Sequence, residues 1–402
     1  MKKTDFTPKE LLRRFFMIDS CYWLSVAGFN ALSIAYVRTL GVTVLQVSVM
    51  AAVFRVAAVL GQFFWSALCD RRQKNREYAL IMLTLVVGAY IFLYSSRVWP
   101  AILISYTLVG FIQLPLNTNM DTWIIRSFNG EAAALPRVRS VGSFFYAVAI
   151  TGIALVIDVT GYIILPVTLL VFYVVLGFLI LNTVPPKQQM GPARQRISLK
   201  NIATLMKIPG YGFCMIIMFV FCFGFMSLWS LITLVFESVG GTAADLSYYS
   251  GIMTLAEAPA MYLVAALAFK IRQEKQLLLG VFLALVQTAM LLFAKTPMLM
   301  ILSGIAAGVS YGFFYAPVRS MVQQMVPQAL ATTAHGFMDA VCFSAAACLG
   351  SLCAGSVIDL LGMHAFVLGC MAFEILSLVL LVIYTVTEPR RARRRAAVLA
   401  AC

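Results

Sequence analysis

The chain divides into twelve long apolar runs, and no other feature of the sequence restricts its fold as strongly. A helix of about 20 apolar residues spans the roughly 30 Å hydrocarbon core of a membrane. Backbone N–H and C=O groups find no water in lipid, so each run is expected to form an α-helix. The expected spans are 15–38, 44–68, 78–96, 99–124, 138–157, 162–183, 209–236, 245–269, 276–295, 298–322, 334–358 and 364–386. The expected fold class is an all-α polytopic membrane protein.

The charge distribution indicates the topology. Only 11% of the residues are charged, and 62% are hydrophobic, which excludes an ordinary soluble protein. The net charge of +14 is compatible with a nucleic-acid partner, but 25 of the 30 Lys and Arg residues lie in segments that a cytoplasmic N-terminus places inside. Such an excess of Lys and Arg on the cytoplasmic side is typical of multi-pass membrane proteins. We therefore expect a multi-pass protein of the cytoplasmic membrane with both termini cytoplasmic, in contact with the bilayer and without a nucleic-acid partner.

Two internal similarities suggest that the chain consists of two related halves. Residues 110–115 (GFIQLP) recur as residues 312–317 (GFFYAP), and residues 76–80 (REYAL) resemble residues 275–279 (KQLLL). Duplicated six-helix halves are common in transporters and place the substrate site near the bilayer midplane. The expected organisation is an N-terminal bundle (1–184), a basic cytoplasmic linker (185–208), a C-terminal bundle (209–387) and a basic cytoplasmic tail (388–402).

Two pairs of opposite charges are expected to lie level in neighbouring spans. Asp121 and Arg139 are each nine residues from position 130, in the polar turn between the fourth and fifth spans. Arg319 and Asp339 are each ten residues from position 329, between the tenth and eleventh spans. In antiparallel helices, residues equally far from the turn lie at similar depth. Charges at membrane depth are costly unless they pair or hold a ligand, so each pair is either a binding site or a structural ion pair.

Further polar residues lie within expected spans. Glu257 stands next to the helix-breaking Pro259 and is a candidate for ligand contact or protonation, because burial disfavours a charged carboxylate. Arg55 does not match Asp19 in depth, so it is either a ligand for an anionic group or the partner of an acid from elsewhere. Glu374 is a further candidate proton carrier, and Asn117 is a candidate substrate ligand one turn before Asp121.

The loop after the second span resembles the signature of the major facilitator superfamily. Asp70, Arg71 and Lys74 match that signature, whereas Ser66 and Gln73 stand where glycines are usual. The resemblance implies a fold of twelve helices in two six-helix bundles and a gating role for Asp70, Arg71 and Lys74.

The fourth, fifth, eighth and eleventh spans resemble the lactose permease-like branch of oligosaccharide and nucleoside proton symporters. In the eighth and eleventh spans the resemblance is carried by residues 256–259 (AEAP) and 334–336 (AHG). Residues 137–142 (RVRSVG) match its Arg-x-Arg-x-x-Gly pattern, and the acid of the fourth helix precedes the second Arg by 18 residues, as Asp121 precedes Arg139. The resemblance implies that Asp121 and Arg139 bind substrate hydroxyls, that Tyr146 stacks on a sugar ring, and that Arg137 belongs to the gate. Where this branch has a His and a Glu for proton coupling, the chain has Gly312 and Tyr315. Coupling is therefore assigned to Glu257, Asp339 with Arg319, or Glu374, unless the protein is not a proton symporter.

The function expected from this resemblance is a monomeric secondary transporter that moves a sugar or similar small polar metabolite, by alternating access and with proton symport. The alternative is a proton antiporter that exports drugs or metabolites. A sensor that kept the fold but lost transport is disfavoured by the charged residues within spans. An enzyme is not expected, because the sequence shows no catalytic constellation. No cofactor and no metal are expected, since the nine Cys have no CxxC spacing and the two His are far apart.

Overall fold

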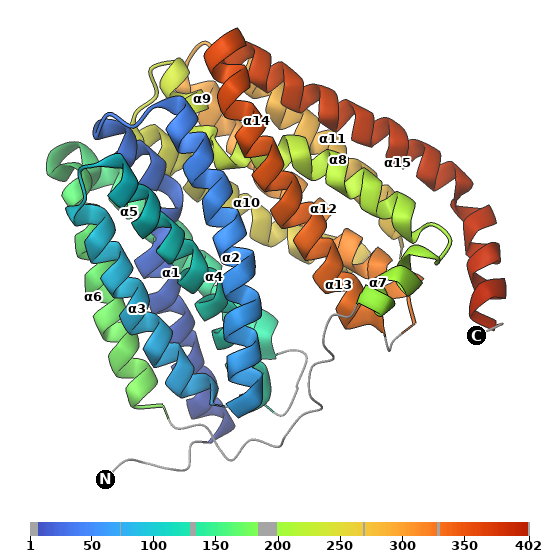
Figure 1. The fold of residues 1–402 in the computed structure, drawn as a ribbon, viewed down its shortest axis with the longest axis horizontal. Coiled ribbons are helices and arrows are strands. Elements are labelled where there is room, and N and C mark those ends of the chain that lie inside the picture. Colours follow the sequence, from blue (N-terminus) through green and yellow to red (C-terminus); the bar gives the residue numbers. More distant parts are fainter. Residues whose placement is uncertain are drawn as a thin grey trace. The chain divides into compact units, whose positions relative to one another are not determined.

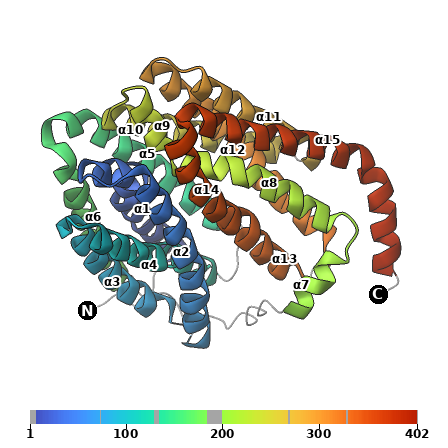
Figure 2. The same cartoon turned by 45° about the horizontal axis from the view of Figure 1, so that its top comes forward.

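The structure is a computed structural model, and it describes residues 7–72, 74–128, 134–183, 199–267, 270–327 and 330–400. All regular elements within these ranges are helical (Figures 1 and 2). The helices before residue 184 are α1 (Pro8–Thr39), α2 (Val44–Arg72), α3 (Asn75–Ser95), α4 (Trp99–Ser127), α5 (Ala134–Thr160), the short 3₁₀ helix η1 (Gly161–Ile163) and α6 (Ile164–Leu181). This confirms the all-α fold class.

The helices after residue 198 continue the same pattern. They are α7 (Leu199–Met206), α8 (Tyr211–Ser230), α9 (Ile232–Ser238), α10 (Ala243–Leu267), α11 (Gln273–Leu292), α12 (Pro297–Met325), α13 (Ala331–Met338), the π-helical segment η3 (Asp339–Ala345), α14 (Ala346–Leu361) and α15 (Met363–Ala400).

Nine stretches of the described residues are long and apolar enough to cross a membrane. One of them, residues 141–181, covers both α5 and α6, whereas α1 and α10 fall outside the nine although they have 32 and 25 residues. The structure is therefore compatible with twelve spans. It corrects three boundaries: the expected seventh span breaks at Leu231, the eleventh contains a π-helical segment, and the twelfth helix continues to Ala400.

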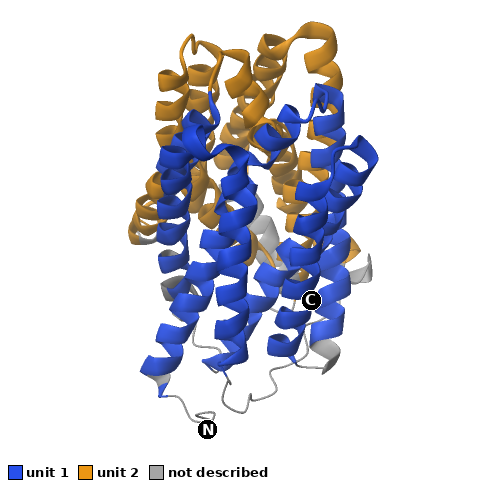
Figure 3. Ribbon diagram, turned by 90° about the vertical axis from the view of Figure 1, so that its left-hand side faces the viewer, with its two compact units in different colours: residues 1–193, 242–254 blue, residues 194–241, 255–402 orange. Residues whose placement is uncertain are grey.

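The chain forms two compact units, which Figure 3 distinguishes by colour. Unit 1 comprises residues 1–193 and 242–254, and unit 2 comprises residues 194–241 and 255–402. In unit 1, α1 packs along α5 and α6, and α4 packs along α2 and α3. In unit 2, α11 packs along α12 and α15, and α8 packs along α14 and α15, as Figure 2 shows.

Glycines allow the closest helix contacts in both units. A Cβ on Gly110 of α4 would lie 2.7 Å from the Phe54 carbonyl oxygen of α2, and a Cβ on Gly312 of α12 would lie 2.8 Å from the Ala260 Cβ of α10. Such distances leave no room for a side chain, so small residues let these helix pairs approach. Gly110 and Gly312 open the two repeated hexapeptides, and these hexapeptides end in Pro115 and Pro317 inside α4 and α12. The repeat therefore occupies matching positions in the two units.

Candidate functional site

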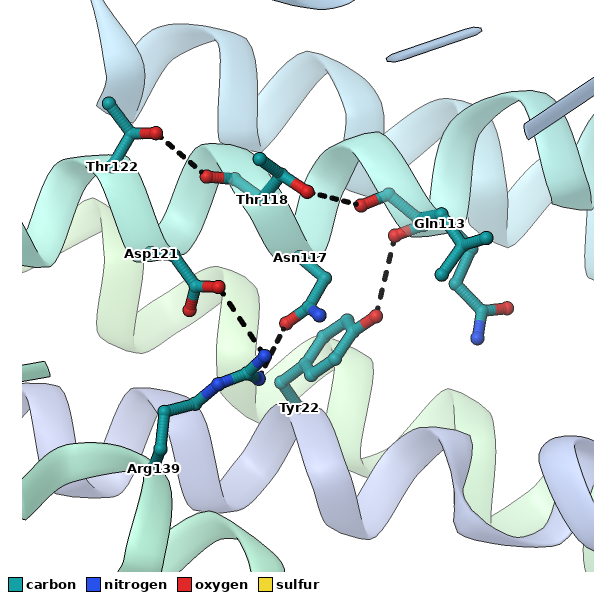
Figure 4. Close-up of polar contacts among 8 residues, drawn as sticks. Tyr22, Gln113, Asn117, Thr118, Asp121, Thr122 and Arg139 are labelled. Carbon is teal, nitrogen blue, oxygen red and sulfur yellow. Dashed lines mark hydrogen bonds and ion pairs between the residues drawn. The ribbon is translucent and has the colours of Figure 1, made fainter. Parts of the chain in front are cut away.

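The first candidate site, in unit 1, is built around the guanidinium group of Arg139, which extends from α5 toward α4 (Figure 4). Arg139 Nη2 lies 3.4 Å from Asp121 Oδ2, and Nη1 donates a hydrogen bond of 3.0 Å to Asn117 Oδ1. Asn117 and Asp121 are four residues apart on α4 and therefore share one helix face. The expected pairing of Asp121 with Arg139 is thus present, and Asn117 completes it.

One aromatic ring, that of Trp23, lies over the same guanidinium, and a second ring, that of Tyr146, packs against Trp23. Arg139 Cζ lies 5.1 Å from the centre of the Trp23 ring, a distance at which a cation–π contact is favourable. The Tyr146 ring meets Trp23 edge to face, with 5.8 Å between ring centres. The predicted aromatic residue, Tyr146, therefore lies in the cluster, but the ring on the arginine is that of Trp23 from α1, which no sequence motif indicated.

The Asp121–Arg139 pair is partly exposed to solvent, and one of its carboxylate oxygens has no hydrogen bond among the described residues. The Arg139 and Asp121 side chains are 32% and 21% exposed, and Asp121 Oδ1 has no hydrogen-bond partner among the described residues. The partly exposed guanidinium offers donors, and the second carboxylate oxygen, Asp121 Oδ1, is a buried acceptor. The arrangement can bind a ligand that presents both donors and acceptors, such as a hydroxyl-bearing ring.

The polar face of α4 extends one turn from Asn117 toward the N-terminus of the helix, to Gln113. Gln113 Nε2 donates to Asn30 Oδ1 at 3.1 Å, the Tyr90 hydroxyl donates to Gln113 Oε1, and the Tyr22 hydroxyl donates to the Gln113 carbonyl oxygen at 3.4 Å. Gln113 is four residues before Asn117 and eight before Asp121. It is not among the residues predicted from the sequence, although this four-residue spacing was a signal for it.

A second carboxylate, that of Asp19, lies beside the cluster. Asp19 on α1 is fully buried, and neither of its oxygens has a hydrogen-bond partner among the described residues. Its charged neighbours are Arg139 and Asp121. Gly142 makes room for it, because a Cβ on Gly142 would lie 2.0 Å from Asp19 Oδ2. Arg55, by contrast, lies near Tyr106, whose hydroxyl shares a 3.0 Å hydrogen bond with Ser33.

In unit 2 the second predicted pair is also present. Arg319 Nη2 of α12 donates to Asp339 Oδ1, the first residue of η3, at 2.7 Å. Arg319 Cζ lies 4.5 Å from the centre of the Tyr315 ring. Each unit thus holds an arginine between a carboxylate and an aromatic ring. The side chains of Arg319 and Asp339 are 31% and 45% exposed, so this pair is also accessible.

Aromatic rings link this pair toward α8 and α10. Tyr315 stacks on Tyr311 with 5.3 Å between ring centres, and Tyr311 meets Trp229 edge to face at 5.2 Å. Glu257 of α10 is close enough to Tyr311 for a direct electrostatic interaction. Glu257 therefore belongs to the surroundings of the Arg319 cluster.

Glu374, the third predicted coupling acid, lies apart from the Arg319 cluster. It is fully buried on α15, where Oε1 accepts a 3.0 Å hydrogen bond from the Thr288 hydroxyl of α11, and Oε2 has no partner among the described residues. The structure does not join Glu374 to the Arg319 cluster through any contact between described residues.

The predicted gating residues are only partly described. Lys74 is exposed and precedes α3. Asp70 and Arg71 belong to α2 and Arg137 belongs to α5, but their side chains lie outside the described residues.

Comparisons with known proteins agree with this architecture. A sequence profile of the Major Facilitator Superfamily matches residues 16–351. Two crystal structures of the nucleoside transporter NupG, one of them a mutant, superpose with TM-scores of 0.76 and 0.74 at 16% and 15% identity. They cover 94% of this chain and 98% and 99% of theirs.

Two further solved structures share the fold. The human organic anion transporter MFSD10 (TETRAN) has a TM-score of 0.64 at 15% identity, covering 94% of this chain and all of its own. A bacterial homolog of the human lysosomal transporter Spinster has a TM-score of 0.67 at 9% identity, covering 97% of this chain and 98% of its own. No curated protein sequence gives a significant match.

At these identities, the solved structures show a shared fold, whereas the profile covers most of the chain and identifies the family. The resemblance that the loop after the second span suggested is thereby confirmed. The protein is a multi-pass membrane transporter and belongs to the Major Facilitator Superfamily.

Proposed function

We propose that the protein is a secondary active transporter that moves a small hydroxyl-bearing solute, a sugar or similar metabolite, in symport with protons. One observation carries this proposal: Arg139 is shared by Asn117 and Asp121 and covered by the Trp23 ring, while Asp121 Oδ1 is left without a partner among the described residues. A guanidinium group, a carboxylate and an aromatic face together suit a ring that carries hydroxyl groups.

The fold relatives suggest which solutes to test first. NupG is named a nucleoside transporter, and a nucleoside presents both ribose hydroxyls and a planar base. The cluster of unit 1 has counterparts for both, in its charged groups and in its Trp23 ring. Nucleosides therefore stand beside sugars in the proposed substrate class.

The proposed substrate ligands are Asp121, Arg139, Asn117, Tyr146, Arg55 and Glu257. For proton coupling we propose the acids of unit 2: Asp339, whose charge Arg319 balances, Glu257 near Tyr311, and the buried Glu374. Asp70, Arg71, Lys74 and Arg137 are proposed gate residues on the family resemblance. The proposed setting is the cytoplasmic membrane, with both termini cytoplasmic and the protein acting as a monomer without nucleic acid.

Solute-induced proton movement in proteoliposomes tests the proposal. Sugars, nucleosides and aromatic acids are added one at a time to wild type, Asp121→Asn, Arg139→Gln and the control Asp158→Asn, which changes an exposed acid of α5. The expected result is external alkalinisation with one solute class, abolished in the first two variants and kept in the control.

Two results contradict parts of the proposal. If a solute moves and both unit 1 variants still bind it normally, the Asp121–Arg139 pair is structural. If no solute enters but preloaded dyes leave against their gradient, the protein is a proton-driven exporter.

The same assay ranks the coupling acids. Asp339→Asn, Glu257→Gln and Glu374→Gln are compared for uptake driven by a proton gradient and for solute exchange without one. A variant that exchanges solute but no longer accumulates it has lost a coupling group. If all three variants still accumulate solute, the coupling assignment to unit 2 is wrong.

A further inference from the structure

Asn30 is an exposed polar residue in a mostly apolar stretch of α1. The five residues before it, 25–29, are all buried, whereas Asn30 itself is exposed. A carboxamide that faced lipid would lose the hydrogen bonds that water gives it, which is costly. Polar side chains within membrane helices are therefore expected to face the bundle interior or a water-filled space. The exposed surface of Asn30 is expected to be of this kind.

Asn30 lies on the same side of α1 as Trp23. Seven residues separate the two, so their side chains point within about 20° of each other and lie about 10 Å apart along the helix axis. Trp23 is the ring that lies over the Arg139 guanidinium. Asn30 therefore belongs to the face of α1 that carries the candidate site of unit 1.

A hydrogen bond from α4 fixes the Asn30 carboxamide. Gln113 Nε2 donates to Asn30 Oδ1 at 3.1 Å. Gln113 is itself buried and held by two tyrosines, because its Oε1 accepts from the Tyr90 hydroxyl and its carbonyl oxygen accepts from the Tyr22 hydroxyl. Residues of α1, α3 and α4 thus meet at one side chain. This network sets the orientation of the Asn30 amide before any solute arrives.

The fixed orientation leaves the donors of Asn30 available. Its Oδ1 is occupied by Gln113, whereas its Nδ2 group has two N–H bonds and no acceptor among the described residues. On α4, Gln113 precedes Asn117 by one turn (Figure 4), which is about 6 Å along the axis. The contact between Gln113 and Asn30 therefore lies one turn from the hydrogen bond between Arg139 and Asn117. One solute can contact both groups.

We propose that Asn30 is a solute ligand of unit 1 that donates a hydrogen bond to an uncharged oxygen of the solute, and that Gln113 is the positioning residue that presents it. The proposal rests on the proposed function, because it assigns a further contact to the same solute. Its consequence is selectivity. A solute that lacks this oxygen leaves the Asn30 donors unpaired and binds more weakly. Asn30 thereby helps to decide which pattern of hydroxyl or carbonyl oxygens the transporter accepts.

The first test determines whether position 30 faces water, and it needs no solute. Asn30→Cys and Val174→Cys, in the whole chain in lipid nanodiscs, are treated with a charged methanethiosulfonate reagent. Mass spectrometry of peptides assigns the label to each cysteine. Val174 is the matched control, because it is 72% exposed on α6, a helix without charged residues. Position 30 is expected to react and position 174 to stay unlabelled. If position 30 reacts no faster than position 174, the proposal is overturned.

The second test measures selectivity. Uridine and glucose, each with its monodeoxy analogues, are titrated against wild type, Asn30→Ala, Gln113→Leu and the control Asp158→Asn, and binding is followed as a shift of the melting temperature. Wild type and the control are expected to bind one deoxy analogue about 5- to 10-fold more weakly than its parent, as for one lost hydrogen bond. Asn30→Ala and Gln113→Leu are expected to bind that analogue and its parent equally.

Two further variants separate a ligand from a structural role. Asn30→Gln keeps an amide and is expected to restore part of the difference between parent and analogue. If Asn30→Ala does not fold, Asn30→Leu, which is close to Asn in size, replaces it. A purely structural role would lower the melting temperature of a variant without solute and leave its selectivity unchanged.

Each remaining result counts against a defined part of the proposal. If Asn30→Ala distinguishes the analogues as wild type does, Asn30 is not a ligand. If only Gln113→Leu does so, Gln113 does not position it. Neither result affects the proposed function, which is supported when a probe binds wild type and not Arg139→Gln. If neither probe binds wild type, the proposed function fails for these solutes, and the role of Asn30 fails with it.

Discussion

His335 Nε2 lies 3.0 Å from Gln323 Oε1. This contact is one helical turn nearer the connection between α12 and α13 than the Arg319–Asp339 ion pair. One turn in the opposite direction, Tyr315 meets Phe343 edge to face with 5.9 Å between ring centres. The three contacts step by four residues along each member of an antiparallel helix pair. The Arg319–Asp339 ion pair is therefore the middle contact of a series, and its neighbours hold the two helices in register.

This series predicts that exchanging the two charges will preserve the fold but not the transport. Arg319→Asp and Asp339→Arg are each expected to lower thermal stability, because each leaves two like charges together. The double variant is expected to recover about 0.5–1 kcal/mol of that loss, within the range measured for exposed pairs. Thermal unfolding of the two single variants and the double variant measures this coupling energy. Additive losses would show that the pair does not contribute to stability.

Arg139→Lys is predicted to weaken solute binding about 10-fold or more, because a lysine cannot serve Asn117, Asp121 and the Trp23 ring at once. The charge is retained, so any loss comes from the geometry of the guanidinium group. Binding is measured as the solute-induced shift of the melting temperature. Arg13→Lys, an exposed arginine on α1, is the control. Equal binding by Arg139→Lys and wild type would mean that only the charge matters.

Gly142→Ala is predicted to damage unit 1. The added Cβ would lie 2.0 Å from Asp19 Oδ2 and 2.4 Å from Trp23 Cδ1, so both side chains must move. A stability loss of about 1–3 kcal/mol is expected from such overpacking, with transport reduced further. Gly152→Ala on the same helix is the matched control, since nothing lies within 4 Å of its Cβ position. A melting temperature for Gly142→Ala equal to that of the control would contradict the close contact.

Arg14→Ala and Arg76→Ala are predicted to loosen the end of α6. Arg14 donates to the Asn182 carbonyl oxygen at 2.9 Å, and Arg76 donates to those of Ile180 and Leu181. Charged donors at a helix C-terminus stabilise its last carbonyl groups. Faster amide hydrogen exchange is expected for residues 178–183 in both variants. Arg13→Ala should exchange as wild type does, and faster exchange there as well would point to a general effect of charge.

The two ion pairs between neighbouring helices show what the sequence could predict. Asp121 and Arg139 are equally far in sequence from the turn that joins their helices, and so are Arg319 and Asp339. Because every α-helix has the same rise per residue, this equal spacing was enough to place each pair at the same depth. The roles of these residues remain predictions. The apolar runs likewise predicted the helices, since lipid leaves the backbone no other choice.

The features that the sequence did not predict depend on packing between segments that lie far apart in the chain. Trp23 and Asp19 join the cluster only because α1 packs along α5, which lies far away in the sequence, and no local pattern encodes that contact. The break at Leu231 has no proline or glycine to mark it. Sequence periodicity describes one helix at a time and does not report which faces meet.

The π-helical segment changes the phase of the span that contains it. In a continuous α-helix, residues eleven apart point within about 20° of each other, because 3.6 residues make one turn. Asp339 and Gly350 are eleven apart, yet Asp339 binds Arg319 on α12, whereas a Cβ on Gly350 would lie 2.7 Å from the Phe223 carbonyl oxygen of α8. A π turn adds a residue without adding a turn, so it rotates the rest of the helix about its axis. One span can thereby direct its ion pair and its tightest glycine contact toward two different helices.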